Sequence, residues 1–372
     1  MSTSPSENDA KNADAKNADA KNADAKNADA KNADAKNADA KNADAKNADA
    51  KNADAKNADA KNADAKNAEQ RGAFDRFWRP TTPALRLATL RVLVGTYGFV
   101  YVLVRLPHLL SYALDDVQRF QPVGLATLAP SPTLPIVYQL LVGLVVLSSA
   151  SFLLGFRHRW LAPLHAMLLT WVLTYTNSWG KILHTDNLFL AHVVVLAFAP
   201  AADTLSLDAR AAKRRGAPAP ADHARYGWAP KLMVALAAAT YLLAGIAKLR
   251  NGGLHFFGGE TLRNFVAFDN ARKIELGDIH SPIGAALLPY PGLFAVLAWF
   301  SMLLEFGAPL ALNRRIGRYW ALGMWGFHLG VLALMAIGFV YPLSFLAFAA
   351  CFDVEKLWSR RPLRALGRKL GS

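Results

Sequence analysis

Long apolar stretches with almost no charge most constrain what this chain can fold into. Residues 131–155 contain no charged side chain, whereas residues 288–312 and 319–348 each contain one acidic or basic side chain, Glu305 and His328 respectively. A helix needs about 20 mostly apolar residues to cross a bilayer. An ordinary soluble domain does not contain several such stretches. The sequence therefore predicts a protein that lives in the lipid bilayer.

The spacing of these stretches predicts an all-α fold, a polytopic helical bundle of about eight transmembrane helices. We expect them at residues 87–104, 132–154, 160–176, 187–201, 232–249, 289–312, 319–339 and 342–352. The fourth and eighth are shorter than a bilayer requires. Tilted, partly unwound or re-entrant segments would account for them, provided that their backbone is buried in protein.

The basic residues between these stretches predict the orientation. With the amino terminus inside, 21 Lys and Arg side chains fall on the inner side and 8 on the outer side. Positive charge collects on the cytoplasmic side of membrane proteins. We therefore expect a multi-pass protein of the inner (plasma) membrane with both termini in the cytoplasm. The formal charge of +14 is spread over these loops, so it gives no reason to expect a nucleic-acid partner.

Residues 1–70 are dominated by a KNADA repeat that has a period of five residues. The repeat contains no apolar residue larger than alanine, so it cannot bury a core. A period of five also drifts around a helix of 3.6 residues per turn. The sequence predicts a disordered tail here, followed by a transmembrane domain over residues 71–353 and a basic cytoplasmic tail over residues 354–372.

Lys248 lies at the end of the apolar stretch WAPKLMVALAAATYLLAGIAKLR, which covers residues 228–250. An ionisable side chain at membrane depth is a functional-site hypothesis by default. Loss of water disfavours the charged form of an amine, and a neutral amine can accept a proton. We therefore expect Lys248 to be a catalytic base. The alternative is that its long side chain extends to the lipid headgroups and has no further role.

A cluster of polar side chains on the predicted outer side accompanies Lys248. The loop TNSWGKILHTDNLFL supplies two further catalytic candidates, His184 and Asn187, and two substrate-binding candidates, Lys181 and Asp186. The loop after Lys248 adds Glu260 and His280 as substrate-binding candidates. The alternative for the first loop is a polar cap that satisfies exposed helix ends, with Asp186 at an N-cap position.

Three further polar residues lie inside predicted helices: Arg91, Glu305 and His328. Each is costly in lipid and should face the interior of the bundle. A structural contact of Glu305 with an arginine or with His328 is favoured over direct catalysis, and Arg91 is the candidate arginine. No spacing of His and Cys residues is typical of a metal site, so none is predicted.

Several of these stretches resemble the HTTM family, the horizontally transferred transmembrane domain that vitamin K-dependent gamma-carboxylases share. The matching stretches are LATLRVLVGTYGF, SWGKILHTDNLFL, APAADTLSLDA, YLLAGIAKLRNGG, EFGAPLAL and FHLGVLALMAIGF, which together extend over residues 87–352. Their order along the chain is that of the family.

The resemblance implies a function for Lys248. In the carboxylases a lysine in an AGxxKL context deprotonates reduced vitamin K, and Lys248 in AGIAKL has the matching position. A reduced quinone, of the vitamin K type or a menaquinol, would be the cofactor, with oxygen and carbon dioxide as co-substrates. Oxygenation of the quinol would create a base that removes a proton from a glutamate side chain of a peptide or protein substrate.

The sequence departs from the carboxylases at two points. The large extramembrane region that follows their membrane domain has no counterpart here, where a short basic tail follows. Their histidine near the start of the fourth helix is matched by Asn187 or Asp186. The family also includes short bacterial members that resemble partners in peptide-toxin maturation. The alternative function is therefore a non-catalytic membrane partner in peptide or toxin maturation or export. Simple transport is disfavoured, because the transmembrane region shows neither an internal repeat nor a run of charged residues along a pathway.

Overall fold

The computed structural model describes residues 72–129, 131–180, 182 and 184–359. By its internal contacts the chain divides into residues 1–67 and residues 68–372, and all that follows concerns the second unit. The predicted repeat tail and the greater part of the predicted basic tail lie outside the described residues. The described part is helical and has no β-strand, although Thr82 and His223 form an isolated antiparallel bridge.

Three helical stretches within the described ranges are long and apolar enough to cross a membrane: Ala84–Leu114, Pro135–Leu154 and Ala224–Gly258. Two shorter apolar helices are Asn187–Phe198 and Pro291–Phe306. Several large apolar side chains on these helices are exposed, such as Leu147 at 70% and Leu243 at 64%. Extensive exposed apolar surface is unfavourable in water and compatible with lipid, which agrees with the prediction of a membrane protein.

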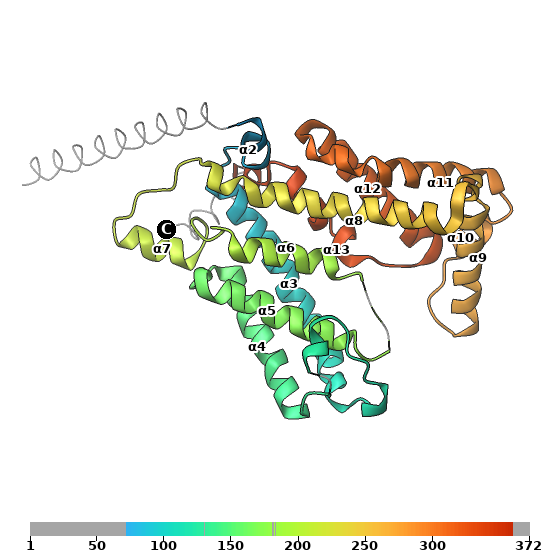
Figure 1. Cartoon of the computed structure of the whole chain (residues 1–372), viewed down its shortest axis with the longest axis horizontal. Helices are drawn as coiled ribbons and strands as arrows, with labels where there is room; N and C mark the ends of the chain where they lie inside the picture. The colour runs from blue at the N-terminus through green and yellow to red at the C-terminus, as the bar shows by residue number, and fades with distance from the viewer. Residues whose placement is uncertain (1–71, 130, 181, 183, 360–372) are drawn as a thin grey trace, which may run out of the picture. The chain divides into compact units, whose positions relative to one another are not determined.

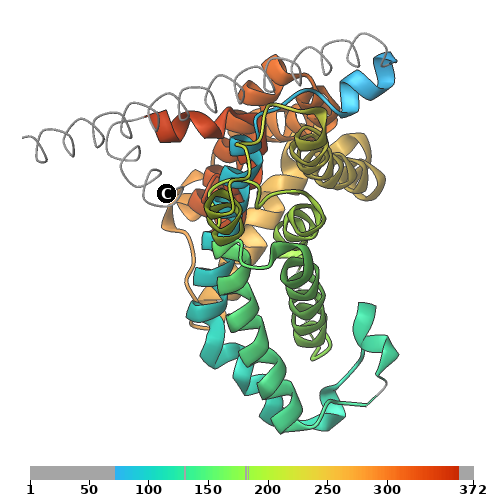
Figure 2. The same ribbon diagram turned by 90° about the vertical axis from the view of Figure 1, so that its left-hand side faces the viewer.

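The first half of the unit contains six described α-helices, and the four longest of them form a bundle. Its α-helices are α2 (Ala73–Trp78), α3 (Ala84–Ser111), α4 (Pro135–Leu154), α5 (His158–Thr176), α6 (Asn187–Phe198) and α7 (Leu207–Arg214). Three 3₁₀ turns lie between α3 and α4: η1 (Tyr112–Leu114), η2 (Val117–Arg119) and η3 (Gly124–Leu128). Helix α3 packs on α4, α4 on α5, α5 on α6, and α6 back on α3. Figure 2 shows α4 beside α3.

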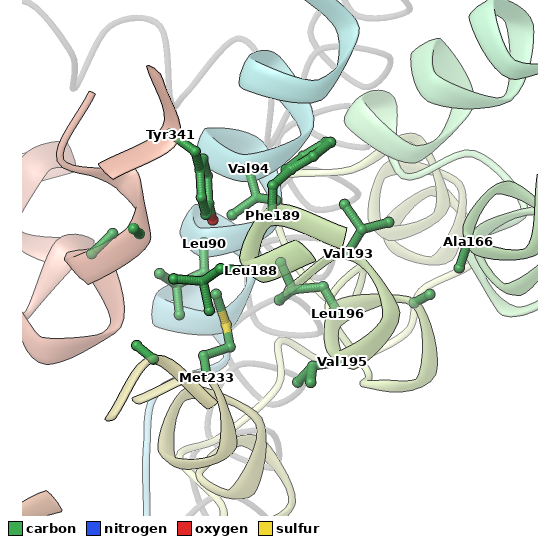
Figure 3. Close-up of a cluster of buried hydrophobic side chains, with 14 of the residues drawn as sticks. Leu90, Val94, Ala166, Leu188, Phe189, Val193, Val195, Leu196, Met233 and Tyr341 are labelled. Atoms are coloured by element: carbon green, nitrogen blue, oxygen red, sulfur yellow. The ribbon is translucent and has the colours of Figure 1, made fainter. Parts of the chain in front are cut away.

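The core of this half is centred on α6. Figure 3 shows its side chains Leu188, Phe189 and Val193 among residues of α3, α5 and the carboxyl-terminal part of the chain. Because α6 is apolar on all sides, it is buried by its neighbours rather than by lipid alone. Tyr341 reaches this core from the other half and places its hydroxyl 2.7 Å from Nδ1 of His192.

The second half is arranged along α8, which runs beside α6 and also contacts α11 and η6 (Figure 1). Its elements are η4 (Ala224–Tyr226), α8 (Trp228–Gly252), η5 (Gly253–Gly258), α9 (Glu260–Glu275), α10 (Pro282–Leu287), α11 (Pro291–Phe306), η6 (Ala308–Leu312), α12 (Arg314–Met335), α13 (Val340–Leu343), η7 (Leu346–Cys351) and η8 (Val354–Ser359). The connection between α8 and α11, predicted as a loop, thus contains two helices, α9 and α10.

These two helices cap the end of α12. Asn270 Nδ2 donates to the Leu334 carbonyl at 2.9 Å, and Lys273 Nζ donates to the Met335 carbonyl at 2.5 Å. The hydroxyl of Ser281, at the start of α10, donates to a third carbonyl of that last turn. The final carbonyls of a helix have no partner inside the helix, so these side chains satisfy groups that would otherwise be costly to bury.

The short stretch predicted at residues 342–352 is only partly helical, which is one of the alternatives that its length left open. α13 ends after one turn because Phe345 adopts a left-handed conformation, with φ 68°, and the 3₁₀ turn η7 follows. Tyr341 and Phe348 are buried, so this irregular backbone is enclosed by protein, which is the condition under which it is tolerated at membrane depth. The segment leads back to the start of α12, where Asp353 pairs with Arg318 at 2.7 Å.

Arg91 is fully buried in α3, and its partners are backbone carbonyls. Its guanidinium donates to the carbonyls of Phe152 (2.9 Å), Leu153, Ala201 (3.0 Å) and Leu205 (2.5 Å). The carbonyls at the carboxyl end of a helix carry partial negative charge, which favours a cation there. The prediction that Arg91 is the partner of Glu305 is therefore wrong, because these carbonyls take up its donors.

Candidate functional site

Helix α8 presents Tyr241, Gly245 and Lys248 on one face. These residues are four and three positions apart, and that spacing places side chains on the same side of an α-helix. Helix α11 packs against this face at Gly245, where an added Cβ would lie 3.0 Å from the Cβ of Glu305. The missing side chain at Gly245 therefore allows the two helices to approach closely.

Lys248 forms an ion pair with Glu305. Lys248 Nζ lies 2.5 Å from Glu305 Oε1; the glutamate side chain is 2% exposed and the lysine side chain 30% exposed. Sequence analysis singled out both residues but did not pair them, and its expectation of a contact between Glu305 and His328 or an arginine is corrected by this pair. At membrane depth little water is available to solvate a charge, so two opposite charges in contact stabilise each other.

His328, on α12, pairs with the tyrosine of the same α8 face. The hydroxyl of Tyr241 lies 2.8 Å from His328 Nε2, and the histidine side chain is buried. This pair adjoins the ion pair, because Tyr241 and Lys248 share one face of α8 and the ring of Phe327 lies 5.2 Å both from Lys248 Nζ and from the ring of His328. The four side chains therefore form one polar group, which we name the lysine cluster: Tyr241, Lys248, Glu305 and His328.

Two atoms of the lysine cluster have no hydrogen-bond partner among the described residues. They are Glu305 Oε2 and His328 Nδ1, and both are buried. A buried polar atom without a partner costs free energy. Unsatisfied groups of this kind call for an explanation, and a small polar ligand is one. A hydroxyl group could donate to the carboxylate oxygen and, depending on the tautomer, donate to or accept from the imidazole.

Aromatic rings surround the charged end of Lys248. Its Nζ lies 5.2 Å from the ring centroid of Phe327 and 5.8 Å from that of Phe256. A third ring, Phe339, contacts His328 at a centroid distance of 5.2 Å. Rings at this range stabilise an ammonium group through the negative charge on their faces. The rings also form an apolar environment that suits a flat, lipid-soluble ligand.

His184 and Asn187, the catalytic candidates of the loop before α6, are not part of the lysine cluster. His184 is exposed, and its ring lies 6.3 Å from that of Phe339, which separates it from His328. Asn187 is the first residue of α6 and is exposed. Lys181 lies outside the described residues. Phe339 thus links His184 to the lysine cluster through ring contacts, a link that spacing in the sequence does not reveal.

Asp186 is held by two side chains of α3. Its Oδ2 accepts a hydrogen bond from the Tyr101 hydroxyl at 2.6 Å and lies 3.4 Å from Arg105 Nη1. Asp186 has the N-cap position of α6, but its side chain makes no capping hydrogen bond. These contacts fix the start of α6 against α3. Tyr101 and Arg105 were not singled out in the sequence.

The two candidates of the later loop lie on the helices that follow α8. Glu260 is the first residue of α9 and is exposed; His280 precedes the start of α10 and is also exposed. The positions of Glu260 and His280 neither support nor contradict a role in substrate binding. Within the described ranges, no three His, Cys, Asp or Glu side chains gather in a way that could hold a metal ion.

Comparison with known proteins identifies the family. The family model of the HTTM domain matches residues 78–358, about three quarters of the 372-residue chain. No curated protein and no solved structure matches the chain. The match includes every helix that contributes to the lysine cluster. On this basis the chain belongs to the HTTM domain family, as its sequence motifs predicted.

Proposed function

We propose that this protein is a membrane enzyme in which Lys248 accepts a proton from a hydroxyl group of a reduced quinone. The observation that carries the proposal is the buried pair of Lys248 with Glu305, whose second carboxylate oxygen has no described partner. A quinone of the vitamin K type or a menaquinol fits the aromatic surroundings and the free hydrogen-bonding atoms. When bound, it would supply an acidic hydroxyl and the electrons that reduce oxygen.

The ion pair would allow Lys248 to become neutral by transferring its proton to Glu305. The pair has no net charge whether its proton lies on Lys248 Nζ or on Glu305 Oε1, so moving the proton between them leaves the total charge unchanged. With the proton on the carboxyl group, the amine has a free electron pair. It can then accept the quinol proton: the O–H bond breaks, an N–H bond forms, and the bonding electrons stay on the oxygen.

The other members of the cluster would position the ligand. Glu305 Oε2 and His328 Nδ1 are the free hydrogen-bonding atoms, and Tyr241 holds the imidazole through Nε2. Phe256, Phe327 and Phe339 would enclose the flat ring and exclude water. Exclusion of water strengthens each electrostatic interaction in the site. We propose that the exposed His184, beyond Phe339, orients a substrate oxygen, with Asn187 as its neighbour in the same loop.

The proposal also states how the chain crosses the membrane. We infer that the chain crosses the inner membrane eight times, with both ends of the described unit in the cytoplasm. Arg86, at the start of α3, pairs with Asp353 at 2.6 Å, so the two ends lie at the same end of the bundle. This agrees with the greater number of basic residues on the side predicted to be inner. The stretch at residues 342–352 would be the eighth crossing despite its irregular backbone.

The proposal is tested by oxygen-dependent conversion of reduced vitamin K or menaquinol to its epoxide by the purified protein in detergent. The variant is Lys248→Ala. The matched control is Arg250→Ala, which removes a positive charge from an exposed position two residues further along α8. Epoxide from the wild type and the control but not from Lys248→Ala supports the proposal.

The absence of epoxide would contradict the proposal. If the folded wild type leaves both quinols intact, the proposed chemistry is wrong for them. The pair of Lys248 and Glu305 would then serve only to hold α8 to α11. In that case the alternative function, a non-catalytic membrane partner for a peptide, would be the better description of the protein.

A further inference from the structure

A second polar region lies at the other end of α8 from Lys248. A cavity of about 360 Å³ opens where α3, α8 and α12 begin, and α2 and the segment after η7 complete its wall. Its charged lining consists of Arg76, Arg86, Lys231, Arg314 and Asp353. Four cationic side chains thus face one carboxylate, and the cavity is suited to an anion.

The cations differ in how far their charge is already neutralised. Arg86 pairs with both Asp353 and Glu355 at 2.6 Å, and Arg314 pairs with Asp353. Lys231 Nζ instead donates to the Leu312 carbonyl at 2.5 Å and lies 3.8 Å from the ring centroid of Phe77. Neither contact neutralises its charge.

Arg76, on the surface of α2, is exposed, and it forms no ion pair with another described residue. Arg76 and Lys231 are therefore the cations with charge to offer a ligand.

Helix starts add to this positive potential. Gly227 and Lys231 lie in the first turn region of α8, Asn313 and Arg314 begin α12, and Arg86 is in the first turn of α3; all of them line the cavity. The amino-terminal end of a helix carries partial positive charge and N–H groups without partners in the helix. Three such ends beside basic side chains are a favourable setting for a phosphate group.

The cavity also lies where two of the stretches able to cross a membrane begin, Ala84–Leu114 and Ala224–Gly258. The ends of a stretch that crosses the bilayer lie beside the lipid headgroups. Phe74 on α2 and Tyr319 on α12 are each 78% exposed near this end. Aromatic side chains of this kind collect at the interface between lipid and water. An anion in the cavity would therefore have acyl chains available to it beside the same helices.

We propose that this cavity binds the phosphate group of an anionic phospholipid, with Arg76 and Lys231 as its principal cations. Basic pockets between membrane helices are suited to such headgroups. The lipid would join α2, α3, α8 and α12 through one phosphate. The site is independent of the lysine cluster and of the chemistry proposed for it.

The test is lipid binding to the purified full-length chain in detergent, measured by native mass spectrometry and by the thermal midpoint. Phosphatidylglycerol is compared with phosphatidylcholine of the same acyl chains. The variant is Arg76→Gln with Lys231→Gln. The control, Arg214→Gln with Arg215→Gln, removes two exposed charges that do not line the cavity. We expect about a tenfold loss of affinity for phosphatidylglycerol in the variant and little change in the control.

Three outcomes would overturn the proposal. Equal losses in the variant and the control would mean that surface charge in general attracts the lipid. Equal binding of the two lipids by the wild type would mean that the phosphate charge is not recognised. Stabilisation by inorganic phosphate or sn-glycerol 3-phosphate as large as that by the lipid, at equal concentration, would identify a soluble phosphate as the ligand. If the double variant does not fold, Arg76→Gln alone, on the exposed α2, replaces it.

Discussion

Lys248 and Glu305 meet across the contact between α8 and α11, with 2.5 Å between Nζ and Oε1. They are 57 positions apart in the chain, and both lie in apolar helices. Each residue alone would be an expensive charge in lipid. Together they form a neutral pair whose remaining carboxylate oxygen has no hydrogen-bond partner among the residues that the structure describes.

This pair predicts a specific pattern of stability. Glu305→Gln or Lys248→Met alone leaves an unpaired charge, so we expect either to destabilise the protein by about 3 kcal/mol, at the lower end of the usual range because Lys248 is 30% exposed. The double variant, which leaves no charge, should be more stable than either single variant. Thermal unfolding of the four proteins in detergent measures the coupling; strictly additive effects would contradict it.

Arg91 should be irreplaceable by lysine. Its guanidinium serves four carbonyls from two segments, the end of α4 and the connection between α6 and α7, whereas an ammonium group has three donors and no planar geometry. We expect Arg91→Lys to cost about 2 kcal/mol or more, because buried carbonyls lose their partners. Arg159→Lys, at an exposed position in α5, is the control and should leave the thermal midpoint unchanged. Equal midpoints for the two variants would contradict the structural role of Arg91.

Asp353 makes stability depend on acid pH. Burial by itself would raise the pKa of this carboxyl, but hydrogen bonds from Arg314 and Lys356 and the charge of Arg86 hold its pKa well below the ordinary value. The ionised group therefore contributes its full stability above pH of about 4, the ordinary range of a free aspartate, and loses it as the pH falls further.

The measurement is the thermal midpoint of the wild type and of Asp353→Asn between pH 6 and pH 3. The wild type should be the more stable protein at pH 6, and the difference should shrink below pH 4. A difference that stays constant over this range would show that ionisation of Asp353 does not contribute.

Gly227 should tolerate no side chain. A Cβ at this position would lie 1.8 Å from the Pro80 carbonyl oxygen, where the chain before α3 crosses the start of α8. We expect Gly227→Ala to lower the thermal midpoint clearly, because backbone must move to make room. Gly143→Ala in α4 is the matched control, since an added Cβ meets nothing within 4 Å. That control should be neutral or slightly stabilising, because alanine favours a helix.

The apolar pattern predicted the position of most helices but not all. The stretch at residues 87–104 lies within α3, and the stretch at residues 132–154 overlaps α4. The last stretch, at residues 342–352, is equally apolar but is not a continuous helix, because Phe345 leaves the helical conformation. Hydropathy reports where a segment can be buried and says little about its backbone. The helix α9 was missed for the converse reason, since charged and polar residues interrupt its apolar ones and leave no long apolar stretch.

The residues of the lysine cluster were largely visible in the sequence, whereas their contacts were not. Lys248, Glu305 and His328 stand out because each interrupts an apolar stretch. Tyr241 does not stand out, because a tyrosine is common in such a stretch. Sequence spacing also suggested the wrong partner for Glu305, since it carries no information on how two helices are rotated about their axes.

The sequence by itself determined the environment of this protein, its helical class and its family, because these depend on composition and order along the chain. Only the tertiary structure decided that Lys248 meets Glu305, that Arg91 meets backbone carbonyls, and that Arg76 and Lys231 share a cavity. Such contacts depend on the depth and rotation of each helix. Close packing, as at Gly245, fixes both, and residues far apart in the chain set it together.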